Sequence, residues 1–194
     1  LADVENHKMI PNQTIVITND LISNILPDQK IKIPENAKII DGSGKYVLPG
    51  LTDAHIHFFQ NGGLYTRPDA IDLQKFMPYQ EEIQLAKDDM VHKLKMYLKN
   101  GITNVIDVGS NYHFLKQREN FRHNDSMPSI YITGPSATTY EPKVYENLKD
   151  DEPFHLAKTV EEGIKMVQNQ LPFKPDFIKI WYIVGADGLS VEES

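Results

Sequence analysis

The sequence predicts an α/β protein, and three observations carry that prediction. The first 49 residues hold short β-branched runs separated by turn residues. From residue 50 onward, apolar strand-like runs alternate with longer segments of helical periodicity. A Pro49-Gly50 turn signal separates the two parts. Strands alternating with helices are typical of βα units and a parallel sheet, so we expect regions of different architecture at residues 1–49 and 50–194.

The first region predicts short antiparallel strands. Thr14 to Thr18 is a β-branched run, and the turn residues after it lead into a second strand, Leu21 to Leu26. Two shorter strands are expected at 37–41 and 46–48, joined by a Gly-rich turn. Hairpin chemistry of this kind favours a small β-sandwich, of which residues 1–49 would form part.

The second region predicts strands and helices in alternation. The expected strands are 51–58, 102–108, 129–133 and 176–181. The expected helices are 80–99, 111–122 and 159–170, and a long loop covers roughly 135–155. Apolar residues at helical spacing support the helix at 80–99, and Asn100-Gly101 is a suitable end for it. Thr159-x-x-Glu162 predicts a capping box at the start of the last helix.

Two histidines, His55 and His57, stand one residue apart on the first strand of this region. Side chains at i and i+2 of a strand share a face, so both imidazoles are expected to point the same way. Such a pair suits two ligands of one metal ion. Asp53, two residues before His55, is expected on the same face.

The stretch Pro-Gly-Leu-x-Asp-x-His-x-His over residues 49–57 resembles the first barrel strand of the amidohydrolase superfamily of metal-dependent hydrolases. The chain is most like the imidazolonepropionase-like and prolidase-like branch. The resemblance implies the N-terminal part of a TIM-like (β/α)8 barrel, about four βα units, preceded by a small β-sandwich segment. It also implies that His55 and His57 bind a divalent metal, expected to be zinc, and that Asp53 supports them.

Lys179 interrupts the apolar run of the fourth expected strand. A parallel barrel strand is buried on both faces, where an unpaired ammonium is costly and its pKa falls. A neutral amine near bound cations reacts with carbon dioxide to form a carbamate. In the binuclear amidohydrolases a carboxylated lysine at the end of strand four bridges two metals, and the resemblance gives Lys179 this role. The alternative is a lysine that reaches solvent or pairs with a carboxylate.

The resemblance implies a hydrolase of amide-type C–N bonds that acts on peptide-like or N-acyl substrates through a metal-bridging hydroxide. Residues 133–139 lack the Gly-Gly-His pattern of dipeptidases in this branch. Imidazolonepropionase uses no bridging lysine, so Lys179 argues against that activity. A different class of function is a non-catalytic binding or assembly module with a degenerate amidohydrolase fold.

Three further residues are candidates for substrate binding. Tyr65 and Arg67 lie in the turn-rich segment after the first barrel strand, where barrel enzymes place active-site loops. Arg67 offers a planar fork for a carboxylate, and the alternative is a solvated loop with internal ion pairs. Tyr140 lies in the long loop and lines either a pocket or the surface. Asp107 either orients a ligand histidine or caps the turn after its strand.

Composition excludes several classes of partner. The chain has 194 residues, a formal net charge of −7 and no cysteine, so neither disulfides nor thiolate metal sites are possible. It has no dense basic cluster and no apolar run of the ~18–20 residues that span a membrane, so neither nucleic acid nor a membrane is an expected partner. The expected partner is a small-molecule or short-peptide substrate. No signal peptide is visible, and compartment and oligomeric state stay open.

Length sets a further expectation. A complete barrel takes about 250 residues, and the sequence predicts only four barrel strands. We therefore expect a full enzyme roughly twice this long, with the chain as its first half. On this expectation the chain by itself lacks the family's further metal ligands and is inactive. It then acts with a missing C-terminal half or as a homo-oligomer.

Overall fold

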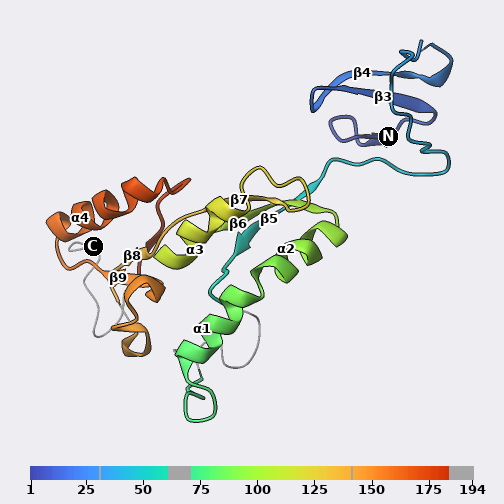
Figure 1. The fold of residues 1–194 in the computed structure, drawn as a ribbon. Helices are drawn as coiled ribbons and strands as arrows, with labels where there is room; N and C mark the ends of the chain where they lie inside the picture. Colours follow the sequence, from blue (N-terminus) through green and yellow to red (C-terminus); the bar gives the residue numbers. More distant parts are fainter. Residues whose placement is uncertain (31, 61–70, 141, 184–194) are drawn as a thin grey trace. The chain divides into compact units, whose positions relative to one another are not determined.

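The computed structural model describes residues 1–30, 32–60, 71–140 and 142–183, and Figure 1 shows its elements. The chain divides into two compact units, Leu1–Pro49 and Gly50–Ser194. The described strands of the first unit form short antiparallel pairs, and the second unit combines parallel sheets with helices. No helix among the described residues is long and apolar enough to cross a membrane.

The N-terminal unit is built from two antiparallel pairs. β1 (Ala2–Asp3) pairs with β2 (Lys8–Met9), and β3 (Gln13–Thr18) pairs with β4 (Leu21–Pro27). The two longer strands match the predicted hairpin. Its turn residues Asn19 and Asp20 both have positive φ, as the tight turns that match strand twist require. A short 3-10 helix, η1 (Asp28–Lys30), follows β4.

The two other strands predicted in this unit are wrong. Residues 37–41 and 46–48 have no strand structure. Near them the Val47 carbonyl accepts one hydrogen bond from the Ala2 backbone, at 2.8 Å. A β-branched run becomes a strand only where a neighbouring strand takes up its backbone hydrogen bonds, and the described part of the unit supplies none here.

The second unit holds two parallel three-stranded sheets. β5 (Leu51–Ile56), β6 (Ile102–Asp107) and β7 (Ser129–Ile132) pair in that order. β8 (Ser136–Thr138) lies between β9 (Phe154–Leu156) and β10 (Ile180–Trp181). β8 follows β7 after residues 133–135, so the chain passes from one sheet to the other at Gly134-Pro135.

Helices connect these strands. They are α1 (Tyr79–Asp88), α2 (Met90–Lys99), α3 (Tyr112–Gln117) with η2 (Arg118–Asn120), and α4 (Val160–Gln170) with η5 (Leu171–Phe173). The single helix predicted at 80–99 is broken at Asp89, whose ψ of 1° interrupts the helical path. Gly101 ends α2 with a φ of +77°, a conformation that favours glycine. Thr159 caps α4 by accepting a hydrogen bond from the Glu162 N–H at 3.2 Å.

The core lies between these helices and the first parallel sheet. Leu94 of α2, Val105 of β6, Phe114 of α3 and Ile132 of β7 have no exposed surface. Each of these residues comes from a different element, so the core packs two helices and two strands of the second unit against one another.

Arg118 ties the end of β7 to the chain that leads into β10. Its side chain is 2% exposed and its guanidinium donates to the Asp176 carboxylate at 2.6 Å and to the Lys174 carbonyl at 2.9 Å. The same Asp176 carboxylate accepts the Ile132 N–H at 2.8 Å. The predicted strand at 176–181 is therefore shortened to β10, because Asp176 forms part of this clasp.

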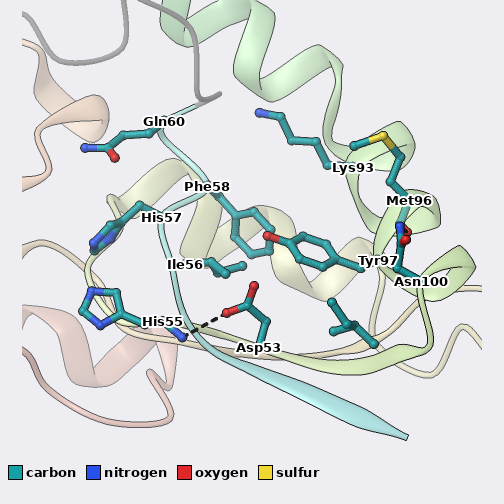
Figure 2. Close-up of a pocket in the computed structure, with 11 residues that line it drawn as sticks. Asp53, His55, Ile56, His57, Phe58, Gln60, Lys93, Met96, Tyr97 and Asn100 are labelled. Carbon is teal, nitrogen blue, oxygen red and sulfur yellow. Dashed lines mark hydrogen bonds between the residues drawn. The ribbon is translucent and has the colours of Figure 1, made fainter.

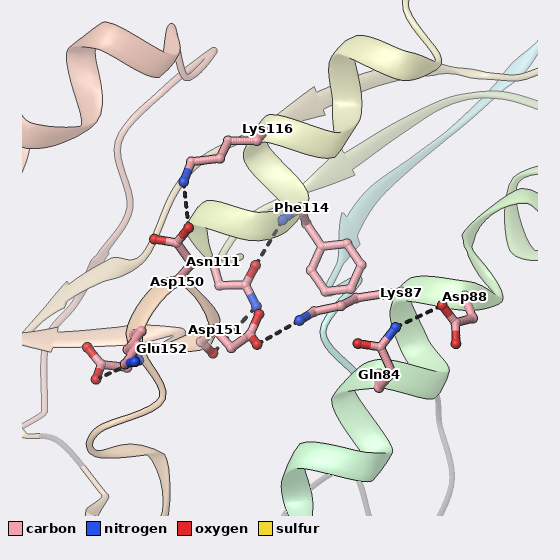
Figure 3. Close-up of polar contacts among 10 residues, drawn as sticks. Gln84, Lys87, Asp88, Asn111, Phe114, Lys116, Asp150, Asp151 and Glu152 are labelled. Atoms are coloured by element: carbon pink, nitrogen blue, oxygen red, sulfur yellow. Dashed lines mark hydrogen bonds and ion pairs between the residues drawn. The ribbon is translucent and has the colours of Figure 1, made fainter.

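The long loop predicted at 135–155 is partly structured. It contains β8, β9 and two 3-10 helices, η3 (Lys143–Tyr145) and η4 (Lys149–Asp151). Figure 3 shows how η4 is held: Lys87 reaches Asp151 and Lys116 reaches Asp150, each at 2.6 Å. Asn111, which caps α3 through the Phe114 N–H, also donates to the Asp151 carbonyl. These contacts fasten the loop to α1 and α3.

Candidate functional site

His55 and His57 lie together at the carboxyl end of β5, as their spacing predicts. Their ring centroids are 5.3 Å apart, with the planes nearly perpendicular. His55 is exposed, whereas His57 is half-buried. Figure 2 shows both imidazoles on the same side of the strand. The pair therefore presents two nitrogen donors to one region of space.

His57 is held by the end of the neighbouring strand. Its Nδ1 lies 2.7 Å from the Gly109 carbonyl oxygen. A carbonyl oxygen only accepts, so Nδ1 carries the hydrogen and the Nε2 lone pair is left available. A hydrogen bond of this kind from a ligand histidine to a backbone carbonyl orients the ring toward a metal.

Asp107 lies close to the same ring. Its side chain is fully buried at the end of β6, and Oδ1 lies 3.8 Å from His57 Nδ1. It accepts the Phe58 N–H at 3.1 Å and the Gly109 N–H at 3.2 Å. Burial raises the pKa of the Asp107 carboxyl, while His57 and the Phe58 N–H act in the opposite direction. Asp107 thus both caps the turn and faces the histidine.

Gly109 has no room for a side chain. A Cβ there would lie 3.0 Å from Ser136 Oγ and 3.2 Å from His57 Cε1. The backbone two residues after β6 therefore lies close to both the His57 ring and Ser136 at the start of β8. This close approach explains the glycine and places Ser136 next to the histidine pair.

Asp53 does not share the face of the histidines, and that prediction is wrong. The register with β6 shifts between Asp53 and Ile56, so three steps along β5 match two along its partner. Such a bulge breaks the alternation of a strand. Figure 2 shows the Asp53 carboxylate beside Tyr97, whereas the imidazoles extend to the other side. Asp53 Oδ1 instead accepts the His55 N–H at 3.3 Å.

Lys179 lies immediately before β10 and is half-buried. Its carbonyl accepts the Ala137 N–H at 3.0 Å, and Ile180 pairs with Ala137. In register Lys179 is therefore opposite Ser136. His57, Gly109, Ser136 and Lys179 thus form a row of neighbours, in which each residue contacts the next or is opposite it in register.

The other predicted site residues fall outside this row. Tyr140 is 43% exposed, and its backbone N–H donates to Thr138 Oγ1. Tyr65 and Arg67 lie outside the described residues.

A pocket of about 570 Å³ adjoins the histidines. The described residues that line it come from β5 and the residues just after it, from α2 and from the start of β6. Neither Lys179 nor Tyr140 is among these described lining residues. The lining residues are Asp53, His55, Ile56, His57, Phe58, Gln60, Lys93, Met96, Tyr97, Asn100 and Ile102. The volume is in the range of small-molecule sites, ~300–1,000 Å³.

Sequence reasoning missed Lys93 and underrated Tyr97. Tyr97 belongs to the apolar face of the predicted helix at 80–99, where it was expected only to pack. Lys93 precedes it by four residues, so the two side chains lie on one face of α2. One sequence signal could have identified Lys93. It is a lysine on the helix face that packs against the strand that carries the histidines.

The donor chemistry fits a divalent metal in part. Two imidazoles, one with a fixed tautomer, match the ligands that zinc and similar ions take. In the part of the chain that the structure describes, no three His, Asp or Glu side chains gather closely enough to hold a metal. The described residues thus supply two donors, half of a tetrahedral set.

Sequence comparisons identify similar proteins. The profile of the amidohydrolase family matches residues 46–175. Adenine deaminase 3 of Rhizobium meliloti (strain 1021) is 34% identical over 56 residues, which are 29% of this chain and 9% of that protein. Imidazolonepropionase of Alkaliphilus metalliredigens (strain QYMF) is 36% identical over 63 residues, 31% of this chain and 15% of that protein.

Solved structures show the same fold over most of the chain. A candidate prolidase from Bifidobacterium longum superposes with a TM-score of 0.65 at 24% identity, covering 93% of this chain and 38% of that one. A prolidase in complex with N-methylphosphonate-L-proline superposes with a TM-score of 0.67 at 23% sequence identity. The match covers 92% of this chain and 43% of that one. Ochratoxinase of A. niger superposes with a TM-score of 0.58 at 16% sequence identity, and the match covers 92% of this chain and 44% of that one. The chain thus spans less than half the length of these structures.

Proposed function

This chain belongs to the amidohydrolase family, and on that premise we propose that it forms the first half of the active site of a metal-dependent hydrolase of C–N bonds. The observation that carries the proposal is the row of His57, Gly109, Ser136 and Lys179, with His55 beside it. Each of these residues is a neighbour of the next: His57 Nδ1 bonds the Gly109 carbonyl, Gly109 approaches Ser136 Oγ, and Ser136 is opposite Lys179 in strand register. Active sites of barrel enzymes form at the carboxyl ends of the barrel strands.

The proposal assigns domains as well. Residues 1–49 form part of a β-sandwich, and residues 50–194 hold the first four strands of a (β/α)8 barrel. Strands one and two are β5 and β6, strand three is β7 continued as β8, and strand four is β10. The passage at Gly134-Pro135 supports this reading, because it joins the two parallel sheets within one strand of the barrel.

The chain's own residues have defined tasks in this proposal. His55 and His57 would hold one divalent metal, expected to be zinc, and the Gly109 carbonyl fixes the His57 tautomer that leaves Nε2 free to bind it. Lys179, carboxylated on Nζ, would serve as a bridging ligand shared by this ion and a second one. When bound, such ions lower the pKa of a water toward ~7 and polarise the carbonyl of an amide. Tyr65, Arg67 and Tyr140 are proposed to contact substrate.

Metal analysis tests the proposal directly. After reconstitution with zinc and bicarbonate, the His55→Ala and Lys179→Ala variants should each retain less metal than the unaltered protein. His92→Ala, which removes an exposed histidine of α2, is the matched control. Equal metal content in all four proteins would contradict the assignment. A protein that takes up no metal at all would support a non-catalytic module instead.

A substrate panel tests the reaction class. Adenine, imidazolone propionate and dipeptides with C-terminal proline correspond to the names of similar proteins. N-acyl amino acids are added because the family resemblance implies them. The expected result is release of an amine or ammonia, or ring opening in the case of imidazolone propionate, and loss of this activity in the His57→Ala variant. A metal-loaded protein of the complete enzyme's length that hydrolyses none of them would contradict the proposed substrate class.

A further inference from the structure

The register of β8 with β9 and β10 brings an aromatic side chain into line with Lys179. Ser136 of β8 is opposite Phe154 of β9, and on its other side it is opposite Lys179. Because side chains alternate along a strand, residues opposite each other in neighbouring parallel strands extend to the same face of the sheet. Phe154 therefore shares the face of Ser136, whose Oγ borders the same space at Gly109 as the His57 ring.

The next layer toward the carboxyl ends of these strands holds no charged side chain. It consists of Leu156, Thr138 and Trp181, which are opposite one another in register and share the face of the layer before it. The Thr138 hydroxyl is already used, because it donates to the Tyr140 carbonyl at 2.7 Å and accepts the Tyr140 N–H at 3.1 Å. This layer therefore presents mainly apolar surface to a ligand.

Trp181 stacks on Phe154. Their ring centroids are 4.6 Å apart and their planes differ by 29°, although β8 separates their strands, so the two rings meet over β8. Phe59 joins this stack to the histidines, because its ring lies 6.3 Å from the Phe154 ring and 5.6 Å from the His57 ring. Phe59 is buried, whereas Phe154 and Trp181 are half-buried, so the stacked pair keeps ring surface on the side of the imidazoles.

Thr139 orders the backbone just after Trp181. Its hydroxyl donates to the Ile183 carbonyl at 2.6 Å and accepts the Ile183 N–H at 3.0 Å. These two bonds continue the pairing of β8 with β10 beyond Trp181, so the backbone that carries the indole is fixed in the free protein. An apolar contact that is fixed in advance costs little ordering when a ligand binds.

We propose that Trp181 is a specificity-determining residue, and that with Phe154 it contacts an aromatic ring that the substrate carries next to its amide bond. The inference rests on the proposed function, because Lys179, the proposed bridging ligand, comes two residues before Trp181 on the same face of the strand. Aromatic rings attract one another in offset-stacked and edge-to-face arrangements. A charged group beside this layer would lose water without gaining a partner, so the layer selects against it.

The test uses Trp181 as a reporter, because it is the single tryptophan of the chain. In the isotope-labelled, metal-free chain its indole N–H gives one NMR resonance. The probes are N-benzoyl-L-alaninamide and N-acetyl-L-alaninamide, two neutral amides that differ in having a phenyl ring or a methyl group. The benzoyl compound should shift the indole resonance and bind roughly tenfold more tightly than the acetyl compound.

Substitutions separate ring contact from a structural role. Trp181→Leu should remove most of the preference for the benzoyl compound, measured by ligand-observed NMR, whereas Trp181→Phe keeps an aromatic ring and should retain most of it. Tyr182→Leu, which removes the exposed ring of the next residue, is the matched control and should leave the preference unchanged. A purely structural Trp181 would lower stability in chemical denaturation and leave the preference of the folded Trp181→Leu chain unchanged, which would contradict the proposal.

The unaltered chain alone can also overturn the proposal. Equal binding of the two compounds, binding of neither, or an indole resonance that stays in place while the benzoyl compound binds would each do so. The measurement needs neither metal nor turnover. An aromatic preference in a chain that takes up no metal would refute the proposed function and leave the contact at Trp181 standing, and turnover without an aromatic preference would do the reverse.

Discussion

The two units of the chain use apolar residues in opposite ways. Among the described residues of Leu1–Pro49 none is buried, and Ile17, Leu21 and Ile40 are 67%, 72% and 82% exposed. In the second unit Leu94 and Val105 have no exposed surface. The first unit has backbone pairing without a core, and the second has both. A hairpin satisfies its own hydrogen bonds, but only a second layer buries its side chains.

This comparison separates local structure from stability. The hairpin of β3 and β4 forms where β-branched residues flank a suitable turn. The apolar side chains of the hairpin add little to the free energy of unfolding, because apolar surface that stays exposed to water gives no hydrophobic stabilisation. The second unit holds the candidate site, and its histidines, Gly109 and Asp107 depend on strands whose ends are fixed by packing.

The largest expected effect comes from breaking the clasp of the second unit. Arg118→Ala leaves Asp176 and two carbonyls without their buried donor, so we expect a loss of roughly 3–5 kcal/mol in the free energy of unfolding. Chemical denaturation measures it. Lys116→Ala, which breaks an exposed pair with Asp150, is the control and should cost about 1 kcal/mol or less. Equal losses would mean that Arg118 is not a structural clasp.

Truncations in the two units sharpen the comparison. Leu94→Ala removes a fully buried side chain and should cost roughly 2–5 kcal/mol. Ile40→Ala removes an exposed one and should stay within about 0.5 kcal/mol. Denaturation of both variants under one set of conditions measures the difference. A large cost at Ile40 would show that this side chain is covered in solution.

A smaller effect is expected at Gly109. Gly109→Ala places a Cβ against Ser136 Oγ and His57, so we expect about 1–3 kcal/mol of lost stability and 10–100-fold weaker zinc binding. Zinc titration and denaturation test the two parts. Gly163→Ala, within α4, is the control. A Cβ at Gly163 would lie 4.0 Å from the Ala157 Cβ, which is an ordinary contact. The substitution should therefore stabilise the protein by about 0.5–1 kcal/mol. Unchanged zinc affinity in Gly109→Ala would separate that carbonyl from the metal site.

The smallest effect is a pH dependence at His155. Its ring packs against Tyr112, and burial lowers the pKa of His155 despite the nearby Glu152. The unfolded chain therefore takes up this proton more readily, so stability is lost as pH falls below about 6.5, the unperturbed value. His155→Gln should reduce the loss between pH 7.5 and 5.5 by less than about 1 kcal/mol. His92→Gln is the exposed control, and an identical pH profile in both variants would contradict the prediction.

Predictions from the sequence held where neighbours along the chain decide the structure. The hairpin at 14–26, the Gly101 end of α2 and the Thr159 cap depend on residues within a few positions of one another. The proximity of His55 and His57 follows from strand geometry in the same way. Residues 46–175 also match the amidohydrolase family, as the motif at 49–57 indicated.

The failures have a common cause. Strands at 37–41 and 46–48 lack a partner, and the run at 176–181 loses its first half because Asp176 binds Arg118. Contrary to the prediction, Asp53 does not share the face of the histidines, because a bulge in β5 shifts its register with β6 between Asp53 and Ile56. In each case a contact with a distant segment outweighed a local preference.

The sequence by itself determined the alternation of strand and helix, the paired histidines and the family, because periodicity and short motifs are local properties. Only the tertiary structure decided that Gly109 holds His57, that Ser136 and Lys179 continue the same row, and that Lys93 points into the pocket. These contacts join residues that are dozens of positions apart. Their geometry follows from packing of whole elements, which no short window of sequence contains.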